Sequence, residues 1–297
     1  MASIPVLLLI VFLLSDYANA QRNHTNKISL GSSLSPKANR TSWLSPSGHF
    51  AFGFYPRGDG FAIGIWLINQ TEKTVTWTAN RDDPPIFSNA TLELTRDGLE
   101  LRIGADKEST IYIDNAPLRA TASAAMLDSG NFMLYNNRSV ALWHTFQEPT
   151  DTILGGQNLY TGDELVSSVS KSDQSSGQFS LLMQDDGNLA AYPVNISRLP
   201  YDIFWSSGTN NSGTDVMLTL NRSGVLFLHG GVGKLDATNS SSGSWDPIEG
   251  LVRMVGENGW WEWLVRMVGG NGWCNNHVLF IRRLGWCNNF YYSFDVF

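Results

Sequence analysis

The stretch Gln184-Asp185-Asp186-Gly187-Asn188-Leu189-Ala190-Ala191-Tyr192 is the part of this 297-residue chain that says most about its fold. In an extended strand, successive side chains point to opposite faces. Gln184, Asp186, Asn188, Ala190 and Tyr192 then share one face, while Leu189 and Ala191 share the other. The stretch therefore predicts a strand with one polar face and one apolar face.

The polar face has the chemistry of a carbohydrate site. Amides, a carboxylate and a phenol can donate to and accept from the vicinal hydroxyls of a sugar ring. A small apolar residue such as Ala190 can touch ring carbons. Asp186-Gly187-Asn188 is also the composition of a tight turn, because these residue types tolerate positive φ. The residues alone leave both interpretations open, a sugar site and a simple turn.

A short unit recurs along the chain, in which a Ser-Gly or Asp-Gly turn leads into alternating apolar residues. This pattern indicates an all-β protein with internal symmetry. The pattern restarts after about residue 155, which predicts two tandem domains, residues 21–155 and 156–245. The units begin at Ser47, Asp97, Ser129, Asp186 and Ser223.

Two longer blocks carry a resemblance to a known family. Residues 74–84, Thr-Val-Thr-Trp-Thr-Ala-Asn-Arg-Asp-Asp-Pro, resemble the T-V-V-W-x-A-N-R-x-x-P signature of plant G-type lectin (S-domain) receptor-like serine/threonine kinases. Residues 142–154 resemble their L-W-x-S-F-x-x-P-T-D-T-x-L block. The family implies tandem β-prism II (bulb-type lectin) domains, each a threefold arrangement of small antiparallel sheets. We expect large aromatic side chains to fill the sheet interiors, namely Trp66, Trp77, Trp143 and Trp205.

The stretch 184–192 is similar to the Q-x-D-x-N-x-V-x-Y mannose-binding motif of the bulb-type lectins, with Ala190 in place of valine. The resemblance implies that Asp186 and Asn188 bind O2 of mannose, Gln184 O3 and Tyr192 O4. In the first domain Leu127 and Ser129 replace the glutamine and the acid of this motif. We therefore expect the equivalent site of the first domain not to bind sugar.

The N-terminus predicts entry into the secretory pathway. Ser3 to Leu14 is an apolar run too short to span a bilayer, and Ala18-Asn19-Ala20 is a cleavage pattern, so we expect residues 1–20 to be a signal peptide. No later apolar run is long enough for a membrane span. We expect a secreted, extracellular (apoplastic) glycoprotein. The N-glycosylation acceptors are Asn23, Asn39, Asn69, Asn89, Asn137, Asn195, Asn210, Asn221 and Asn239.

Composition argues against several other functions. The net charge of −7 becomes −6 when Asp16 leaves with the signal peptide, so no basic footprint for nucleic acid is present. The five histidines show no metal-ligand spacing, and we expect no metal and no cofactor. Kinase motifs are missing, and paired carboxylates occur only as sequence neighbours, so we expect no catalytic residues.

Residues 246–297 are expected to form a repetitive tail of uncertain, poorly defined structure. Leu251 to Trp260 is nearly repeated thirteen residues later, from Leu264 to Trp273. The chain's two cysteines, Cys274 and Cys287, lie in two copies of one short repeated segment. Whether they form a disulfide stays open.

Two functions remain open on the sequence. One is a secreted lectin that binds mannose-type glycans or glycoproteins in cell-surface recognition or defence signalling. The other is the ectodomain of a membrane receptor-like kinase, cut before its EGF-like, PAN, membrane-spanning and kinase parts, with a degenerate sugar site and a role in protein–protein recognition. Further copies of this chain or a receptor kinase are the protein partners to expect.

Overall fold

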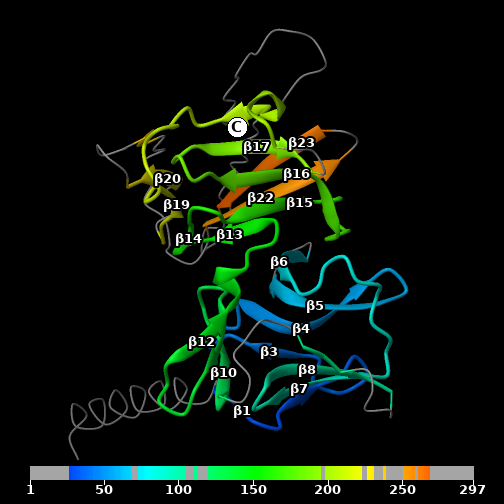
Figure 1. The fold of residues 1–297 in the computed structure, drawn as a ribbon. Coiled ribbons are helices and arrows are strands. Elements are labelled where there is room, and N and C mark those ends of the chain that lie inside the picture. The colour runs from blue at the N-terminus through cyan, green and yellow to red at the C-terminus, as the bar shows by residue number, and fades with distance from the viewer. Residues whose placement is uncertain are drawn as a thin grey trace, which may run out of the picture. The chain divides into compact units, whose positions relative to one another are not determined.

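The computed structural model describes residues 27–68, 73–104, 110–112, 120–194, 198–222, 226–230, 237–238, 250–257 and 260–267. The predicted signal peptide, Cys274, Cys287 and the acceptors Asn23, Asn69, Asn195 and Asn239 lie outside these residues. The described chain is built from strands, apart from two single-turn 3-10 helices (Figure 1). The all-β class predicted from the sequence is confirmed.

The recurring Gly turns set the hairpins. In the four units whose glycine is described, that glycine has positive φ, a conformation that costs a residue without a Cβ little. Each of these turns joins two antiparallel strands, as the repeated unit predicts. The glycines are Gly48 (φ 75°), Gly98 (109°), Gly130 (81°) and Gly187 (85°).

Residues 28–144 form three four-stranded antiparallel sheets, the building pattern of the β-prism II fold. The first has the order β1-β10-β11-β12, with β1 Ile28–Ser29, β10 Ser123–Met126, β11 Phe132–Tyr135 and β12 Ala141–His144. The second is β2-β7-β8-β9, with β2 Ser33–Leu34, β7 Ala90–Thr95, β8 Gly98–Ile103 and β9 Thr110–Tyr112. The third is β3-β4-β5-β6, with β3 Ser42–Leu44, β4 Phe50–Arg57, β5 Gly60–Leu67 and β6 Thr74–Thr78.

Two further sheets follow after the 3-10 turn η1, Thr145–Gln147. One has the order β13-β22-β15-β16-β17-β18, with β13 Thr152–Leu154, β15 Glu164–Ser168, β16 Ser176–Met183, β17 Leu189–Pro193, β18 Trp205–Ser206 and η2 Pro200–Asp202 before β18. The other is β14-β19-β20-β21, with β14 Gln157–Leu159, β19 Met217–Leu220, β20 Leu226–His229 and β21 Ala237–Thr238.

Part of the region expected to be a tail forms strands. β22, Gly250–Glu257, pairs antiparallel with β13 and touches β15 in parallel, and β23, Trp260–Met267, pairs with β22 along its length. β22 contains the start of the first copy of the thirteen-residue repeat, whereas β23 runs from Trp260 into only the first four residues of the second copy, Leu264 to Met267.

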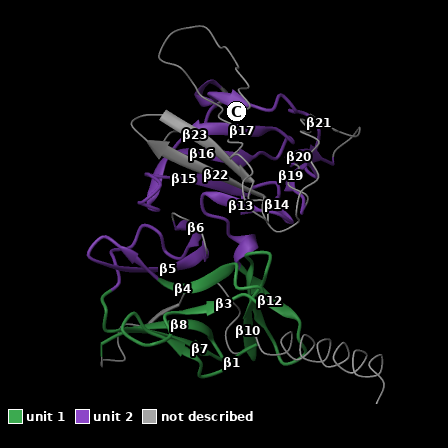
Figure 2. Cartoon of the chain, turned by 180° about the vertical axis from the view of Figure 1, so that it is seen from behind, with its two compact units in different colours: residues 1–54, 87–144 green, residues 55–86, 145–297 purple. Residues whose placement is uncertain are grey.

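The chain divides into two compact units, coloured separately in Figure 2. One contains residues 1–54 and 87–144, and the other contains residues 55–86 and 145–297. Residues 55–86 precede the boundary inferred from the repeats, yet they group with the residues after it. The domains 21–155 and 156–245 stay a prediction.

Each unit has its own apolar core. In the first, the rings of Trp43, Phe52 and Phe132 stack, and the Phe52 and Phe132 centroids are 3.9 Å apart. In the second, a buried cluster includes Leu165, Leu181, Leu189, Ala191 and neighbouring aliphatic residues. The expected tryptophans behave as predicted, since Trp66, Trp77 and Trp143 are buried and Trp205 packs against the second cluster.

The signature block 74–84 anchors itself within the second unit through Arg81. Its guanidinium is buried and donates to four backbone carbonyls, those of Gln174 at 2.6 Å, Val166 at 2.8 Å, and Ser167 and Ser175 at 3.0 Å. Five donors in a rigid fork suit such a task better than the point charge of a lysine. The block resembles a family signature, and its arginine holds the β15–β16 hairpin.

Asp82 extends this anchor. Its two carboxylate oxygens accept from the Ser176 backbone N–H at 2.7 Å and from the Ser176 hydroxyl at 2.6 Å. Burial acts to raise the pKa of Asp82, but the Ser176 hydrogen bonds, with Arg81 and Arg57 nearby, lower that pKa below its usual value.

We predict that the stability conferred by Asp82 is lost in acid. A carboxyl with a lowered folded-state pKa contributes above its unfolded pKa, near 3.9, and loses that contribution as the pH falls through the folded value. The free energy of unfolding of Asp82→Asn should lie below that of the parent at pH 7, and the two should converge below about pH 4. Asp83→Asn, which changes the charge equally but leaves the Ser176 bonds, is the control. A gap that widens in acid would contradict this.

A second prediction concerns the stacked core of the first unit. Phe132 is fully buried between Trp43 and Phe52, so Phe132→Ala removes a large ring and leaves a cavity. Denaturant unfolding should show a loss of about 3–5 kcal/mol. Exposed Phe87→Ala is the matched control and should change stability by less than about 0.5 kcal/mol. Similar losses in both variants would contradict the assigned core.

Candidate carbohydrate site

The five motif residues lie on the β16–β17 hairpin. The turn from Gln184 to Asn188 closes through a bond from the Gln184 N–H to the Asn188 carbonyl at 2.9 Å. The Gly187 N–H also donates to the Gln184 carbonyl, at 3.1 Å. The Asp186 carboxylate accepts from the Asn188 N–H at 3.0 Å, which is the local bond that makes aspartate a turn residue.

The neighbouring loop supports this turn from outside. The Thr209 hydroxyl donates to the Gly187 carbonyl at 2.8 Å, and the Ser212 N–H donates to the Asp186 carbonyl at 3.0 Å. A Cβ at position 187 would lie 2.7 Å from the Gly213 carbonyl oxygen. Only glycine therefore fits there, both for its φ of 85° and for this close approach.

The predicted alternation is present on β17 itself. Leu189 and Ala191 belong to the buried core cluster, whereas Ala190 and Tyr192 do not. Gln184 and Asp186 precede the strand and lie in the turn, so the extended strand expected over the whole stretch begins only at Leu189. The tight turn and the polar row exist together, and the two sequence interpretations are compatible.

The turn brings the side chains of Gln184, Asn188 and Tyr192 together. The Asn188 amide nitrogen donates to the Gln184 side-chain oxygen at 3.1 Å, and the Gln184 amide nitrogen donates to the Tyr192 hydroxyl at 2.6 Å. Asp186 is exposed beside them. The result is a small polar cluster of two amides, a phenol and a carboxylate, which is the chemistry that the sequence predicted.

The cluster is largely covered in this structure. Tyr192 is 1% exposed, Ala190 0% and Asn188 6%. Glu164, Leu182 and Ala190 stand in one cross-strand row on the outer face of β15, β16 and β17. Arg198, from the β17–β18 connection, reaches the Glu164 carboxylate at 2.7 Å and 2.8 Å. Its guanidinium therefore lies over the same face as Ala190 and Tyr192.

The electrostatics of Tyr192 favour its neutral form. Burial raises the pKa of the Tyr192 hydroxyl, the nearby Asp186 and Asp202 charges raise it further, and Arg198 acts in the opposite direction. The hydroxyl therefore keeps its proton throughout the physiological range and remains a hydrogen-bond donor.

The equivalent hairpin of the first unit lacks this cluster. On β10–β11, Leu127 and Ser129 occupy the glutamine and aspartate positions, and the Tyr135 hydroxyl donates to the Met133 sulfur at 3.1 Å. The Ser129 hydroxyl accepts from the Asn131 N–H at 3.4 Å, so it retains only the turn role of Asp186. Of the polar groups, Asn131 and Tyr135 remain.

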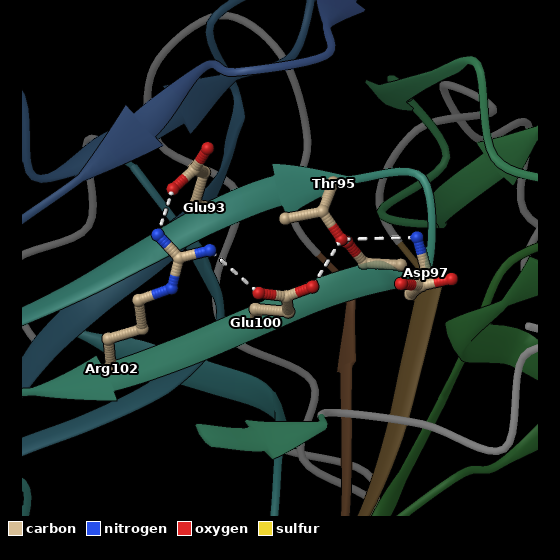
Figure 3. Close-up of polar contacts among 6 residues, drawn as sticks. Glu93, Thr95, Asp97, Glu100 and Arg102 are labelled. Atoms are coloured by element: carbon tan, nitrogen blue, oxygen red, sulfur yellow. Dashed lines mark hydrogen bonds and ion pairs between the residues drawn. The ribbon is translucent and has the colours of Figure 1, made fainter. Parts of the chain in front are cut away.

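The β7–β8 hairpin carries ion pairs in place of the cluster (Figure 3). Arg102 contacts Glu93 and Glu100, each at 2.8 Å, and Thr95 donates to the other oxygen of Glu100 at 2.7 Å. The Thr95 hydroxyl also accepts from the Asp97 N–H at 3.1 Å. These charged groups satisfy one another on the strand face.

Within the described part of the chain, no group of three or more His, Cys, Asp or Glu side chains could hold a metal ion, and no helix is long and apolar enough to cross a membrane. The described glycosylation acceptors Asn39, Asn89, Asn137 and Asn210 are exposed, and Asn221 is half-buried.

Sequence reasoning missed Ser207 and Thr209. The Ser207 hydroxyl lies 3.2 Å from the Asn188 side-chain oxygen, and the Thr209 N–H donates to that oxygen at 3.2 Å. They are about twenty residues from the motif in the chain, and the pairing of β17 with β18 brings them alongside it. The two-residue period of β17 contains no signal for them.

Comparisons with known proteins identify the family of this chain. The family model described as D-mannose binding lectin matches residues 74–172. A G-type lectin S-receptor-like serine/threonine-protein kinase of Oryza sativa subsp. indica, LECRK3, is 35% identical over 236 residues, which are 75% of this chain and 28% of the relative. RLK1 of Arabidopsis thaliana, of the same class, is 31% identical over 76% of this chain and 29% of its own length. The chain thus spans little more than a quarter of these relatives.

Solved lectin structures match parts of the chain at low similarity. The mannose-specific agglutinin from snowdrop bulbs is 19% identical, with a TM-score of 0.28, over 42% of this chain and 94% of its own. The two-domain Scilla campanulata agglutinin is 15% identical, with a TM-score of 0.25, over 77% and 92%. The chain contains a D-mannose binding lectin domain and, over about three quarters of its length, is homologous to the G-type lectin S-receptor-like kinases.

Proposed function

We propose that this chain binds mannose-type glycans through Gln184, Asp186, Asn188, Ala190 and Tyr192. The observation that supports this most is the polar cluster on the β16–β17 hairpin, in which two amides and a phenol are joined by hydrogen bonds beside an exposed carboxylate. Such a cluster offers donors and acceptors within a few ångströms of one another, as the neighbouring hydroxyls of one sugar ring require. The family description supports the same ligand class.

The proposal includes a secreted, glycosylated product that acts at the cell surface. Exposure of four described acceptor asparagines supports glycosylation. Because one weak site gives little affinity for a monosaccharide, the physiological ligand is a multivalent glycan or glycoprotein, or the chain acts as an oligomer. Recognition or defence signalling at the cell surface is the role that fits these properties.

A second candidate is protein recognition by the ectodomain of a receptor-like kinase. Two observations favour it, namely the kinase relatives, of which this chain spans little more than a quarter, and the burial of Ala190 and Tyr192. If neither the parent protein nor a variant with an opened face binds mannoside, this second function is supported over the first.

One prediction for this site tests the role of the Asp186 carboxylate. Asp186→Asn keeps an acceptor for the Asn188 N–H and so keeps the turn, but it removes a charged acceptor, whose hydrogen bonds are stronger by about 1 kcal/mol or more. Mannoside affinity in calorimetry should fall at least about fivefold to tenfold with the fold unchanged.

Asp185→Asn is the matched control for this prediction. Asp185 is the exposed neighbour, and the substitution changes the net charge equally. It should leave the affinity unchanged. Equal losses in the two variants would show that overall charge, and not the carboxylate of Asp186, governs binding.

Another prediction for this site tests how easily a sugar can reach it. A sugar must reach Ala190 and Tyr192, so the Arg198–Glu164 ion pair over this face competes with it. Arg198→Ala should raise mannoside affinity, by up to about fivefold if the partly exposed pair contributes about 1 kcal/mol. Arg102→Ala, which breaks a comparable ion pair on β8, should have no effect. A lower affinity in Arg198→Ala would show that Arg198 contacts the sugar.

A further inference from the structure

One contact decides which way the amides of the cluster point. A backbone N–H can only donate, and the Thr209 N–H lies 3.2 Å from the Asn188 side-chain oxygen. The nitrogen of that amide must then face the Gln184 oxygen, and the Gln184 nitrogen must face the Tyr192 oxygen. Turning Asn188 over would set two donors against each other and break both bonds of the amide. The row therefore has a fixed direction, from Thr209 to Tyr192.

The position of Thr209 is fixed by two hydroxyl groups, its own and that of Ser207. The Leu189 N–H donates to the Ser207 hydroxyl at 3.0 Å, and the Thr209 hydroxyl donates to the Gly187 carbonyl at 2.8 Å. The two hydroxyls are 2.6 Å apart. With the Thr209 proton directed to Gly187, the Ser207 hydroxyl donates either to the Asn188 side-chain oxygen, at 3.2 Å, or to the Thr209 oxygen. This second row of bonds ties Thr209 to both ends of the segment 187–189.

We propose that Thr209, supported by Ser207, is a positioning residue of the carbohydrate site and acts through Asn188. By fixing the Asn188 amide it makes Tyr192 an acceptor toward Gln184, so that the Tyr192 proton and the second N–H of each amide are left for the ligand. The ligand class is thereby a sugar with acceptor oxygens facing these donors and a hydroxyl that donates to Asp186. This inference rests on the proposed function.

The binding test compares two substitutions at the same position. Thr209→Val removes the hydroxyl that holds this residue, whereas Thr209→Ser keeps it. Thr219→Val is the control, because the buried Thr219 hydroxyl on β19 has no hydrogen-bond partner among the described residues. Methyl α-D-mannoside affinity should fall about fivefold to tenfold in Thr209→Val and return in Thr209→Ser. The loss should vanish in an Asn188→Ala background, because the two residues act as one unit.

A second ligand, the 2-deoxy analogue of the mannoside, distinguishes a positioning role of Thr209 from a general disturbance of the site. Thr209→Val should lose affinity for methyl α-D-mannoside but little for its 2-deoxy analogue, since the resemblance assigns Asn188 to the 2-hydroxyl. Equal losses for the two sugars, or a loss that persists in the Asn188→Ala background, would overturn the positioning role. Mannoside binding by the parent protein that Thr209→Val does not alter would also overturn it while leaving the proposed function intact.

A ligand-free measurement keeps the inference testable if the parent binds no mannoside. Side-chain amide protons of Asn188 and Gln184 should exchange slowly with solvent in the parent by NMR, and faster in Thr209→Val but not in Thr219→Val. Unchanged exchange in Thr209→Val would overturn the inference. Faster exchange without any mannoside binding by the parent would support the fixed row and reject the proposed sugar function.

Discussion

The constraint on which this structure depends is that successive side chains of a strand point to opposite faces, so that only one set of them can enter the apolar core. On β17, Leu189 and Ala191 enter the core cluster, and this fixes Ala190 and Tyr192 on the outer face. A slip of one residue would exchange the two sets and bury polar groups in the core, so the register is strongly determined. The glycine at position 187 sets where the turn occurs. The candidate site is thus a consequence of how the hairpin buries its apolar side chains.

The same hairpin plan leaves different chemistry on different outer faces. The β16–β17 face has amides and a phenol. The β10–β11 face has a tyrosine whose hydroxyl is hydrogen-bonded to a methionine sulfur, and the β7–β8 face has Arg102 between two glutamates. Partly exposed ion pairs add little stability, about 0–1 kcal/mol each, so their main effect at β7–β8 is to occupy that face with charges satisfied by one another. A repeated scaffold can therefore keep its fold while, of these three described hairpins, one retains a sugar-like pattern of donors and acceptors.

Much of this could be predicted from the sequence, because local rules govern it. The glycine turns mark four hairpins, the alternating residues mark their faces, and buried Trp66, Trp77 and Trp143 occupy the interiors expected of them. The clustering of Gln184, Asn188 and Tyr192 could be expected from their spacing. The strand start at Leu189 could not, because turn bonds of Gln184 and Asp186 override the extended period.

The remaining features depend on contacts between residues far apart in the chain. Thr209 reaches Asn188 only because β17 and β18 pair, and Arg198 reaches Glu164 only because the connection returns over the sheet. Arg81 could be recognised in a signature block, but its four carbonyl partners belong to a hairpin more than eighty residues away. No local periodicity encodes such contacts. The pairing of β22 with β13 could not be predicted from the sequence either, because a repeated segment does not indicate which strand it will pair with.

The central claim is that a single face of this chain is equipped to bind mannose. The most direct measurement is a calorimetric titration of the whole chain with methyl α-D-mannoside, which reports the number of sites as well as the affinity. The account predicts one site per chain and an affinity that falls about tenfold, but stays measurable, when Asn188 is replaced by alanine. Two or three equal sites, or an affinity that Asn188→Ala leaves unchanged, would contradict the claim.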